Sequence, residues 1–160
     1  MREIKLVIDE KLLTEYLQYW KRFHPLSRNH PLAKPNSKDK TKGYIFGCSI
    51  NEFTNLPNRV MQNNLKQNWK NFFIWWANKE KIGGWKLNKF EISYKWVFDS
   101  QRRHDSDNYV FFNKFVADGL SEAEVITDDC FGSMYLVLDG NKYVDKEHPR
   151  VEINIRELGD

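Results

Sequence analysis

Strict alternation of side chains at residues 90–98 constrains the fold of this chain most. Apolar groups occupy every second position, at Phe90, Ile92, Tyr94, Trp96 and Phe98, and they alternate with the polar residues Lys89, Glu91, Ser93 and Lys95. A period of two is typical of a β-strand with one buried face and one solvated face. Alternation at 4–8 and at 151–155, and an apolar run at 134–138, predict three further strands.

Helical spacing occupies much of the chain between these predicted strands. A short amphipathic helix is predicted at 12–20, and a longer one begins at 54–57, where a threonine cap precedes a proline. The longer helix repeats large apolar residues at Met61, Leu65, Trp69, Phe72 and Trp76. So many large groups do not all fit on one helix face, so we expect some in the core and the surplus in a homodimer interface.

Composition indicates one folded domain. The chain has 160 residues, of which 15% are aromatic and 29% charged, and its net charge of +3 is too small to indicate a nucleic-acid partner by itself. No apolar run is long enough to span a membrane, and the first residues follow a strand pattern, not a signal peptide. Cys48 and Cys130 lack metal-ligand spacing, which favours a reduced, cytoplasmic protein.

A basic insert at about 21–55 interrupts the pattern. Three prolines, Pro25, Pro31 and Pro35, exclude regular structure from 21–43, so we expect a long loop. The loop is predicted to be either a solvated, mobile connection or an arm that follows a phosphate backbone. The four histidines lack metal-ligand spacing and are predicted on the surface: His24, His30, His104 and His148.

Acidic residues gather after the strand at 90–98. Asp105 and Asp107 are two apart in an extended segment, so their side chains can point to one place. A helix is predicted at 108–120, capped by Ser106 or Asp107 and ending near Gly119, and a second acidic pair follows it at 128–129. Carboxylates that fold together need a cation, so the pattern predicts a Mg²⁺ site beside a helix N-terminus, where phosphate oxygens also bind.

Other interpretations of the acidic residues are less favoured. Taken alone, residues 105–108 are more often a solvated turn with a helix cap than a metal site. A calcium-binding EF-hand loop is excluded because Val110 occupies the position of its required glycine. Phosphotransferases with an Asp-x-Asp motif need a larger α/β domain than this chain provides.

The complete pattern resembles the RusA family of Holliday junction resolvases. The shared elements are Arg103-His104-Asp105-Ser106-Asp107-Asn108, a helix with Lys114, Asp118 and Leu120, and then Asp128-Asp129. The resemblance covers 103–129, and the strand before it and residues 149–155 also fit the family's layout. The insert at about 21–55 does not align with the family.

The resemblance implies a homodimeric, Mg²⁺-dependent endonuclease, with Mn²⁺ as a substitute, that nicks two strands of a four-way DNA junction symmetrically. Asp105, Asp107 and Asp129 would hold the metal, and Lys114 would be the catalytic lysine. Three extra residues precede this lysine relative to well-known members. On an unbroken helix Lys114 keeps the stripe of Asp107 and Asp118 but lies about one turn further along, unless the extra turn unwinds. Asp118 is expected in a supporting role.

Basic residues are expected to contact the DNA. Those beside the acidic motif are Arg102, Arg103 and His104, and those in the insert are Arg28, Lys34, Lys38, Lys40 and Lys42. Two alternatives stay open: a non-cleaving dimer that binds branched DNA, and a nuclease for other branched DNA. The predicted fold is a single α+β domain over 1–160, with a small mixed β-sheet packed against helices in the order β-α-β-α-β-β.

Overall fold

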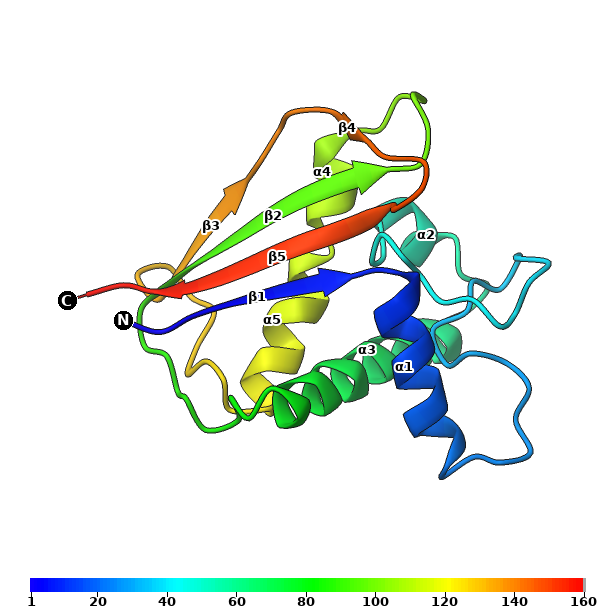
Figure 1. Cartoon of the computed structure of the whole chain (residues 1–160), viewed down its shortest axis with the longest axis horizontal. Helices are drawn as coiled ribbons and strands as arrows, with labels where there is room; N and C mark the ends of the chain where they lie inside the picture. The colour runs from blue at the N-terminus through cyan, green and yellow to red at the C-terminus, as the bar shows by residue number, and fades with distance from the viewer. Residues whose placement is uncertain (160) are drawn as a thin grey trace.

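A mixed β-sheet organises the chain, and the computed structural model describes residues 1–159. The elements in chain order are β1 (Glu3–Ile8), α1 (Glu10–Lys21), α2 (Ile50–Thr54), α3 (Arg59–Lys79), β2 (Phe90–Phe98), α4 (Ser106–Val110), α5 (Asn113–Glu122), β3 (Met134–Leu138), β4 (Tyr143–Val144) and β5 (Arg150–Glu157). The strands lie in the order β1-β5-β2-β3, and β4 pairs with β2 beyond the end of β3 (Figure 1).

The central strand, β2, joins the two kinds of pairing. It is antiparallel to β5 and parallel to β3 and β4, and β5 is in turn antiparallel to β1. The predicted α+β class and mixed sheet are therefore confirmed. Each of the two longer helical stretches holds two helices where one was predicted, and the two-residue strand β4 was not predicted.

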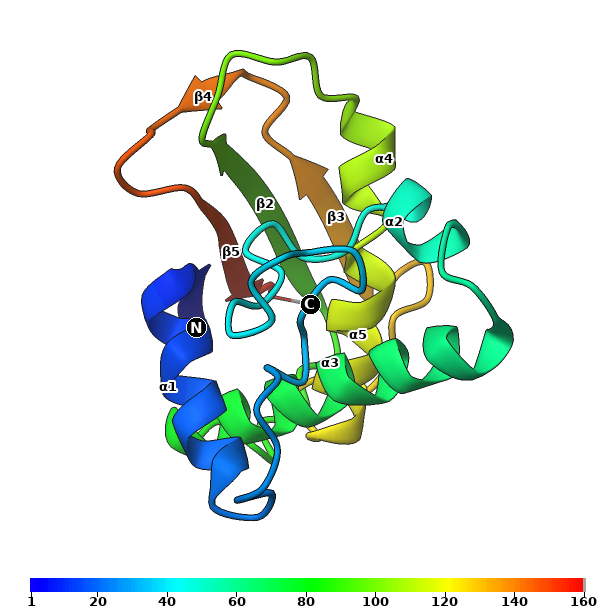
Figure 2. The same ribbon diagram turned by 90° about the vertical axis from the view of Figure 1, so that its right-hand side faces the viewer.

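The helices cover one face of the sheet (Figure 2). The alternating side chains of β2 and β5 are buried on that face, while the opposite face carries charged residues. Lys5 pairs there with Glu152 at 2.7 Å, and Arg156 pairs with Glu91 at 3.2 Å. An antiparallel arrangement tolerates one solvated face, and this explains why the sequence alternates so strictly.

The large aromatic groups of α3 fill the chain's own core. Trp69, Phe72 and Phe73 are fully buried, and Trp76 is nearly so. Helix α5 can approach α3 closely because Gly119 has no side chain: a Cβ at this position would lie 2.6 Å from the Cβ of Phe73. The prediction that surplus aromatic groups need a homodimer interface is therefore wrong, because α1, α5 and the sheet bury them.

The insert between α1 and α2 has no helix or strand, as predicted, but it packs into the core. It gathers at the right-hand end of the molecule in Figure 1, the end that faces the viewer in Figure 2, and Leu32, Tyr44 and Cys48 are buried. His30 is 3% exposed, which corrects its predicted surface position. Its Nε2 lies 2.9 Å from the carbonyl oxygen of Leu13, and its Nδ1 accepts the N–H of Leu32 at 3.0 Å. The insert is thus anchored to α1.

Helix boundaries differ from the sequence prediction in the middle of the chain. Thr54 ends the short helix α2, and α3 begins at Arg59 after Asn58, whose side chain caps the N–H of Met61. The sequence hid α2 because its five residues are too few to show a helical period. None of the helices described over 1–159 combines the length and apolar character that crossing a membrane requires.

Candidate active site

The first acidic pair lies where β2 ends. Asp105 is extended and occupies the N-cap position of α4, but its carboxylate makes no capping hydrogen bond. It accepts instead from Nε of Arg103 at 3.2 Å, in a pair whose side chains are 90% and 61% exposed. Such an exposed pair contributes little stability, so this carboxylate stays available for another partner. Helix α4 has only five residues, so the expected helix N-terminus offers little dipole.

The second member of the pair, Asp107, is exposed, and within residues 1–159 no hydrogen bond or ion pair engages its carboxylate. The next residue, Asn108, has a structural contact: its Oδ1 accepts the N–H of Asn51 at 3.0 Å. This bond ties the beginning of α2, and with it the end of the insert, to the acidic motif.

Aromatic rings form the wall beside the acidic pair. The ring of His104 stacks on Phe98 with a centroid distance of 3.7 Å, and its Nδ1 lies 3.2 Å from the hydroxyl oxygen of Tyr109. Burial lowers the pKa of His104, and the charges of Arg102 and Lys142 lower it further. His104 is therefore held as part of this aromatic wall, and its lowered pKa disfavours the protonated form that would attract a phosphate most strongly.

A cavity of about 100 Å³ opens between this wall and the loop after β3. Its apolar lining includes Trp96 and Phe98, and its polar lining includes Asp105, Asp139 and Lys142. Because β2 and β3 are parallel, their carboxyl ends point the same way, and this brings the loop after β3 to the acidic pair.

Asp139 and Lys142 were missed as site residues. The backbone N–H of Asp139 donates to the carbonyl of Tyr94 at 2.9 Å. Its carboxylate accepts from the N–H of Asn141 at 3.1 Å and from the hydroxyl of Tyr143 at 2.8 Å, and these bonds hold its pKa below the usual range. The sequence predicted only a turn here; the parallel pairing of β3 with β2 was the signal that could have revealed it.

Lys114 and Asp118 lie on a separate helix. The predicted helix over 108–120 breaks at 111–112, where Phe112 turns into the core against Trp69 at a centroid distance of 4.7 Å. Gly47 makes room for it, since its φ is +73° and a Cβ there would lie 2.4 Å from the Phe112 ring. Lys114 is exposed in the first turn of α5, and it forms no ion pair with Asp118. The continuous stripe calculated for an unbroken helix therefore does not apply.

The second acidic pair lies at the opposite end of β2. Register places Met134, five residues after Asp129, beside Phe90 at the start of β2, whereas Asp105 follows the end of β2. In Figure 1 the loop before β3 lies at the tail of the β2 arrow and α4 at its head. A nine-residue strand is about 26 Å long, far beyond the reach of a shared ion.

The predicted cluster of three aspartates is therefore not assembled within one chain. Over residues 1–159, no three His, Cys, Asp or Glu side chains gather in a group that could hold a metal ion. Asp128 accepts the N–H of Asp129 at 2.7 Å, while both residues stay exposed. The structure brings together Asp105 and Asp139, and leaves Asp129 and Lys114 elsewhere.

Three of the five predicted DNA contacts in the insert are engaged within the chain. Lys34 pairs with Glu52 at 2.9 Å, Lys42 pairs with Glu10 at 3.7 Å, and Nζ of Lys40 donates to the carbonyls of residues 34 and 35. Arg28 and Lys38 are exposed and make no ion pair within the described chain. These two keep the features expected of phosphate contacts.

No protein-family model and no curated protein matches this chain.

Proposed function

We propose that this chain is a Mg²⁺-dependent endonuclease that cuts branched DNA, with four-way junctions as its main substrate, and that it works as a homodimer. The carrying observation is the pair Asp105 and Asp107, two exposed carboxylates separated by one residue just after the carboxyl end of the central strand. Neither is tied up in a structural role.

The chemistry of this pair suits Mg²⁺. This ion is commonly held by one or two carboxylates together with substrate phosphate oxygens, so Asp105 and Asp107 form an adequate protein contribution. When bound, the ion supplies positive charge that offsets the charge developing on the scissile phosphate. Nζ of Lys142, in the same cavity wall, donates to the carbonyl of Gln101 at 2.5 Å and has two further N–H groups that can bind a phosphate oxygen, and the exposed Arg102 and Arg103 add affinity for the backbone.

A dimer formed through β3 would bring the missing aspartate. Strand β3 is an edge strand whose only partner in the described sheet is β2, and Tyr135, Leu136 and Val137 are each about 45% exposed on it. Edge strands with apolar, uncharged sequences pair readily with a second chain. Pairing β3 antiparallel across a two-fold axis would put the start of the partner's strand beside Leu138.

In that arrangement, Asp129 of the partner subunit approaches Asp105 and Asp107 of the first. Antiparallel pairing reverses the strand, so the amino end of one β3 lies at the carboxyl end of the other. Each of two sites would then combine acids from both chains. A symmetric dimer with two such sites suits paired nicking of a junction, because a four-way junction presents two equivalent strands.

A nicking assay on synthetic four-way junctions tests the proposal. With Mg²⁺, the wild-type chain should cut the junction and leave linear duplex intact, and EDTA should stop cutting. Asp107→Asn should lower the rate at least about 100-fold, since even residues behind metal ligands contribute 10- to 100-fold. Glu122→Gln, an exposed acid at the end of α5, is the matched control and should cut normally.

The other possible results of the nicking assay lead to different conclusions. Junction binding without cutting by the wild-type chain supports a non-cleaving DNA-binding dimer instead. Preferential cutting of forks or flaps keeps the nuclease and changes its substrate. Normal cutting by Asp107→Asn contradicts the metal role of the acidic pair.

A further inference from the structure

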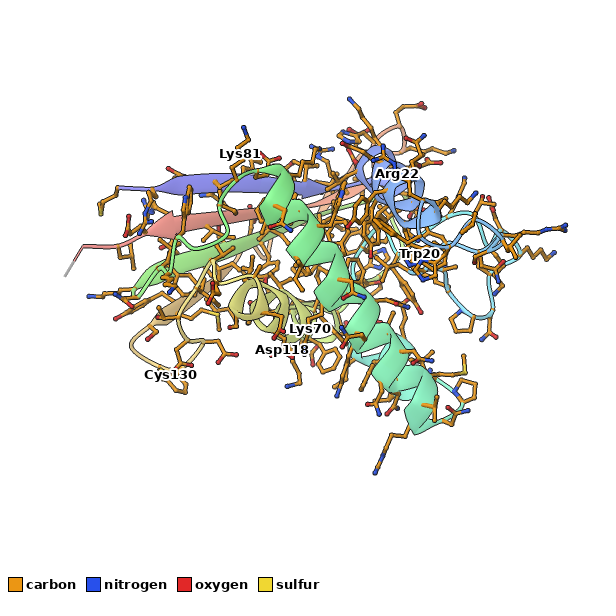
Figure 3. The ribbon with its side chains drawn as sticks, turned by 90° about the horizontal axis from the view of Figure 1, so that it is seen from below. Trp20, Arg22, Lys70, Lys81, Asp118 and Cys130 are labelled. Atoms are coloured by element: carbon orange, nitrogen blue, oxygen red, sulfur yellow. The ribbon has the colours of Figure 1, made fainter. Side chains whose placement is uncertain are left out.

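The end of α1 carries an exposed aromatic and cationic surface, here named the α1 tip and defined as residues 19–28. Phe23 is 67% exposed, Leu26 is 95% exposed and Tyr19 is 37% exposed, in a chain that buries most of its large aromatic groups. In Figure 3, Trp20 and Arg22 lie to the right of the centre of the molecule, and Cys130, the neighbour of Asp129, lies at the lower left. The α1 tip is therefore separate from the loop before β3.

The rings of the α1 tip are held in position before any partner binds. His24 stacks on Trp20 with a centroid distance of 4.1 Å and an interplanar angle of 9°, and its Nδ1 lies 3.2 Å from the Trp20 carbonyl oxygen. Phe23 packs against Tyr19 at 5.4 Å, and Tyr19 stacks on the buried Tyr16 at 6.2 Å. Rings fixed in this way lose little side-chain entropy when a planar partner stacks on them.

The charged side chains of the α1 tip itself are all positive. No aspartate or glutamate occurs between Glu15 and Asp39, a span that includes Lys21, Arg22 and Arg28. All three are exposed, and none forms an ion pair with another residue in 1–159. The α1 tip thus combines exposed flat rings with cations that have no acidic partner in the described chain.

We propose that the α1 tip binds an unpaired DNA strand, stacking bases on the Phe23 and Trp20–His24 rings while Lys21, Arg22 and Arg28 contact phosphates. Surfaces that bind single strands combine aromatic platforms with a cationic path along the backbone. An anionic membrane would also attract the cations and can take up Phe and Leu side chains, but His24 covers the Trp20 ring in a parallel stack, an arrangement that offers a flat platform and not an apolar wedge. The planar stack therefore favours nucleic-acid bases.

This inference does not depend on cleavage by the proposed active site. Binding at the α1 tip requires neither Mg²⁺ nor Asp107, so it is measured in EDTA with the Asp107→Asn chain as well as with the wild type. Junction cutting and single-strand binding are then measured separately, so that one can be lost while the other is kept. A chain that binds a single strand but never cuts would refute the proposed nuclease and keep the α1 tip.

The probe is a fluorescein-labelled oligo-dT of about 20 nucleotides, long enough to cross the α1 tip. Phe23→Ala should weaken its binding about five- to 150-fold, the effect of losing one stacked base. Arg22→Ala should flatten the logarithmic salt dependence by about 0.7, the value for one phosphate contact on a single strand. Both residues are exposed, so thermal melts of the variants should match the wild type.

Matched controls lie away from the α1 tip. Val60→Ala removes another exposed apolar group, 67% exposed at the start of α3, and Lys11→Ala removes a cation at the other end of α1. Both should bind the probe like the wild type. Three results would overturn the inference. The first is that Phe23→Ala binds the oligonucleotide as tightly as the wild type, and the second is that it loses as much affinity for a hairpin duplex of the same charge as for the single strand. The third is that the wild-type chain binds phosphatidylserine vesicles but not the oligonucleotide.

Discussion

Replacing His30 by alanine should loosen the basic insert, because His30 fastens this segment to α1. The imidazole is 3% exposed and holds two backbone groups at once, the carbonyl of Leu13 on α1 and the N–H of Leu32 in the insert. Since Nδ1 accepts from an N–H, the proton of the neutral ring lies on Nε2 and is donated to Leu13.

The cost of His30→Ala follows from these two bonds. Each buried backbone group left without a partner costs about 1–3 kcal/mol, so the two together cost about 2–6 kcal/mol. The free energy of unfolding of a small domain is about 5–15 kcal/mol, so His30→Ala removes a large part of it. Urea unfolding followed by circular dichroism measures it. A loss below about 0.5 kcal/mol, typical of a surface change, would refute the anchoring role.

The same histidine predicts a pH dependence with a definite sign. Burial lowers the pKa of His30 below its ordinary 6.5 in the folded chain. Above pH of about 6.5 the ring is neutral in both states and its contribution is complete. Below that pH the unfolded chain takes up a proton that the folded chain refuses, so stability falls by up to about 1.4 kcal/mol per pH unit until the lowered pKa is reached.

His30→Gln separates this effect from the titration of other groups. Glutamine keeps a donor near the position of Nε2 but takes up no proton. The free energy of unfolding should therefore fall less steeply between pH 6.5 and 5.5 in His30→Gln than in the wild type. Parallel slopes for the two proteins would contradict the buried, neutral assignment of this ring.

Three further predictions concern packing, assembly and the candidate active site. Gly119→Ala should destabilise the chain by about 1–3 kcal/mol, because a new Cβ meets Phe73, and an unchanged melting temperature in calorimetry would contradict this contact. Leu136→Glu should give folded monomers in sedimentation, with the circular dichroism spectrum of the wild type, since two like charges would face each other across paired β3 edges; a wild-type chain that is already monomeric would refute the interface. Lys142→Ala should slow junction cutting more than Lys114→Ala does. The reverse order would indicate that Lys114, and not Lys142, contacts the phosphate.

Sequence patterns predicted the fold where the contacts are local. The alternation in β1, β2 and β5 reports a buried face directly, and these strands occur where the pattern placed them. The break between α4 and α5 was not predicted, because Phe112 leaves the helical path to pack on α3, a contact distant in sequence. The buried position of His30 was missed for the same reason: its two partners are backbone groups, which leave no trace in residue types.

The candidate active site was predictable only in part. Asp105 and Asp107 are two residues apart, so both follow the end of β2 whatever the rest of the fold, but Asp107 lies inside α4 and not in the extended segment that was predicted. The position of Asp129 depends on β3 pairing in parallel with β2, and on the register of that pairing, which no local pattern contains. Asp139 was overlooked for the same reason: β3 ends opposite Tyr94 in β2, and only this parallel pairing directs the loop after β3 along β2 toward Asp105.

Mixing two inactive variants tests most directly whether the proposed active site combines acids from two chains. Asp107→Asn and Asp129→Asn should each fail to cut a four-way junction alone. After subunit exchange, half of the dimers would contain one of each, and each such dimer would have one intact site, so about a quarter of the wild-type sites should return and nick one strand. Restored nicking is the predicted result. A mixture as inactive as its components, under conditions where the wild type cuts, would contradict the shared site.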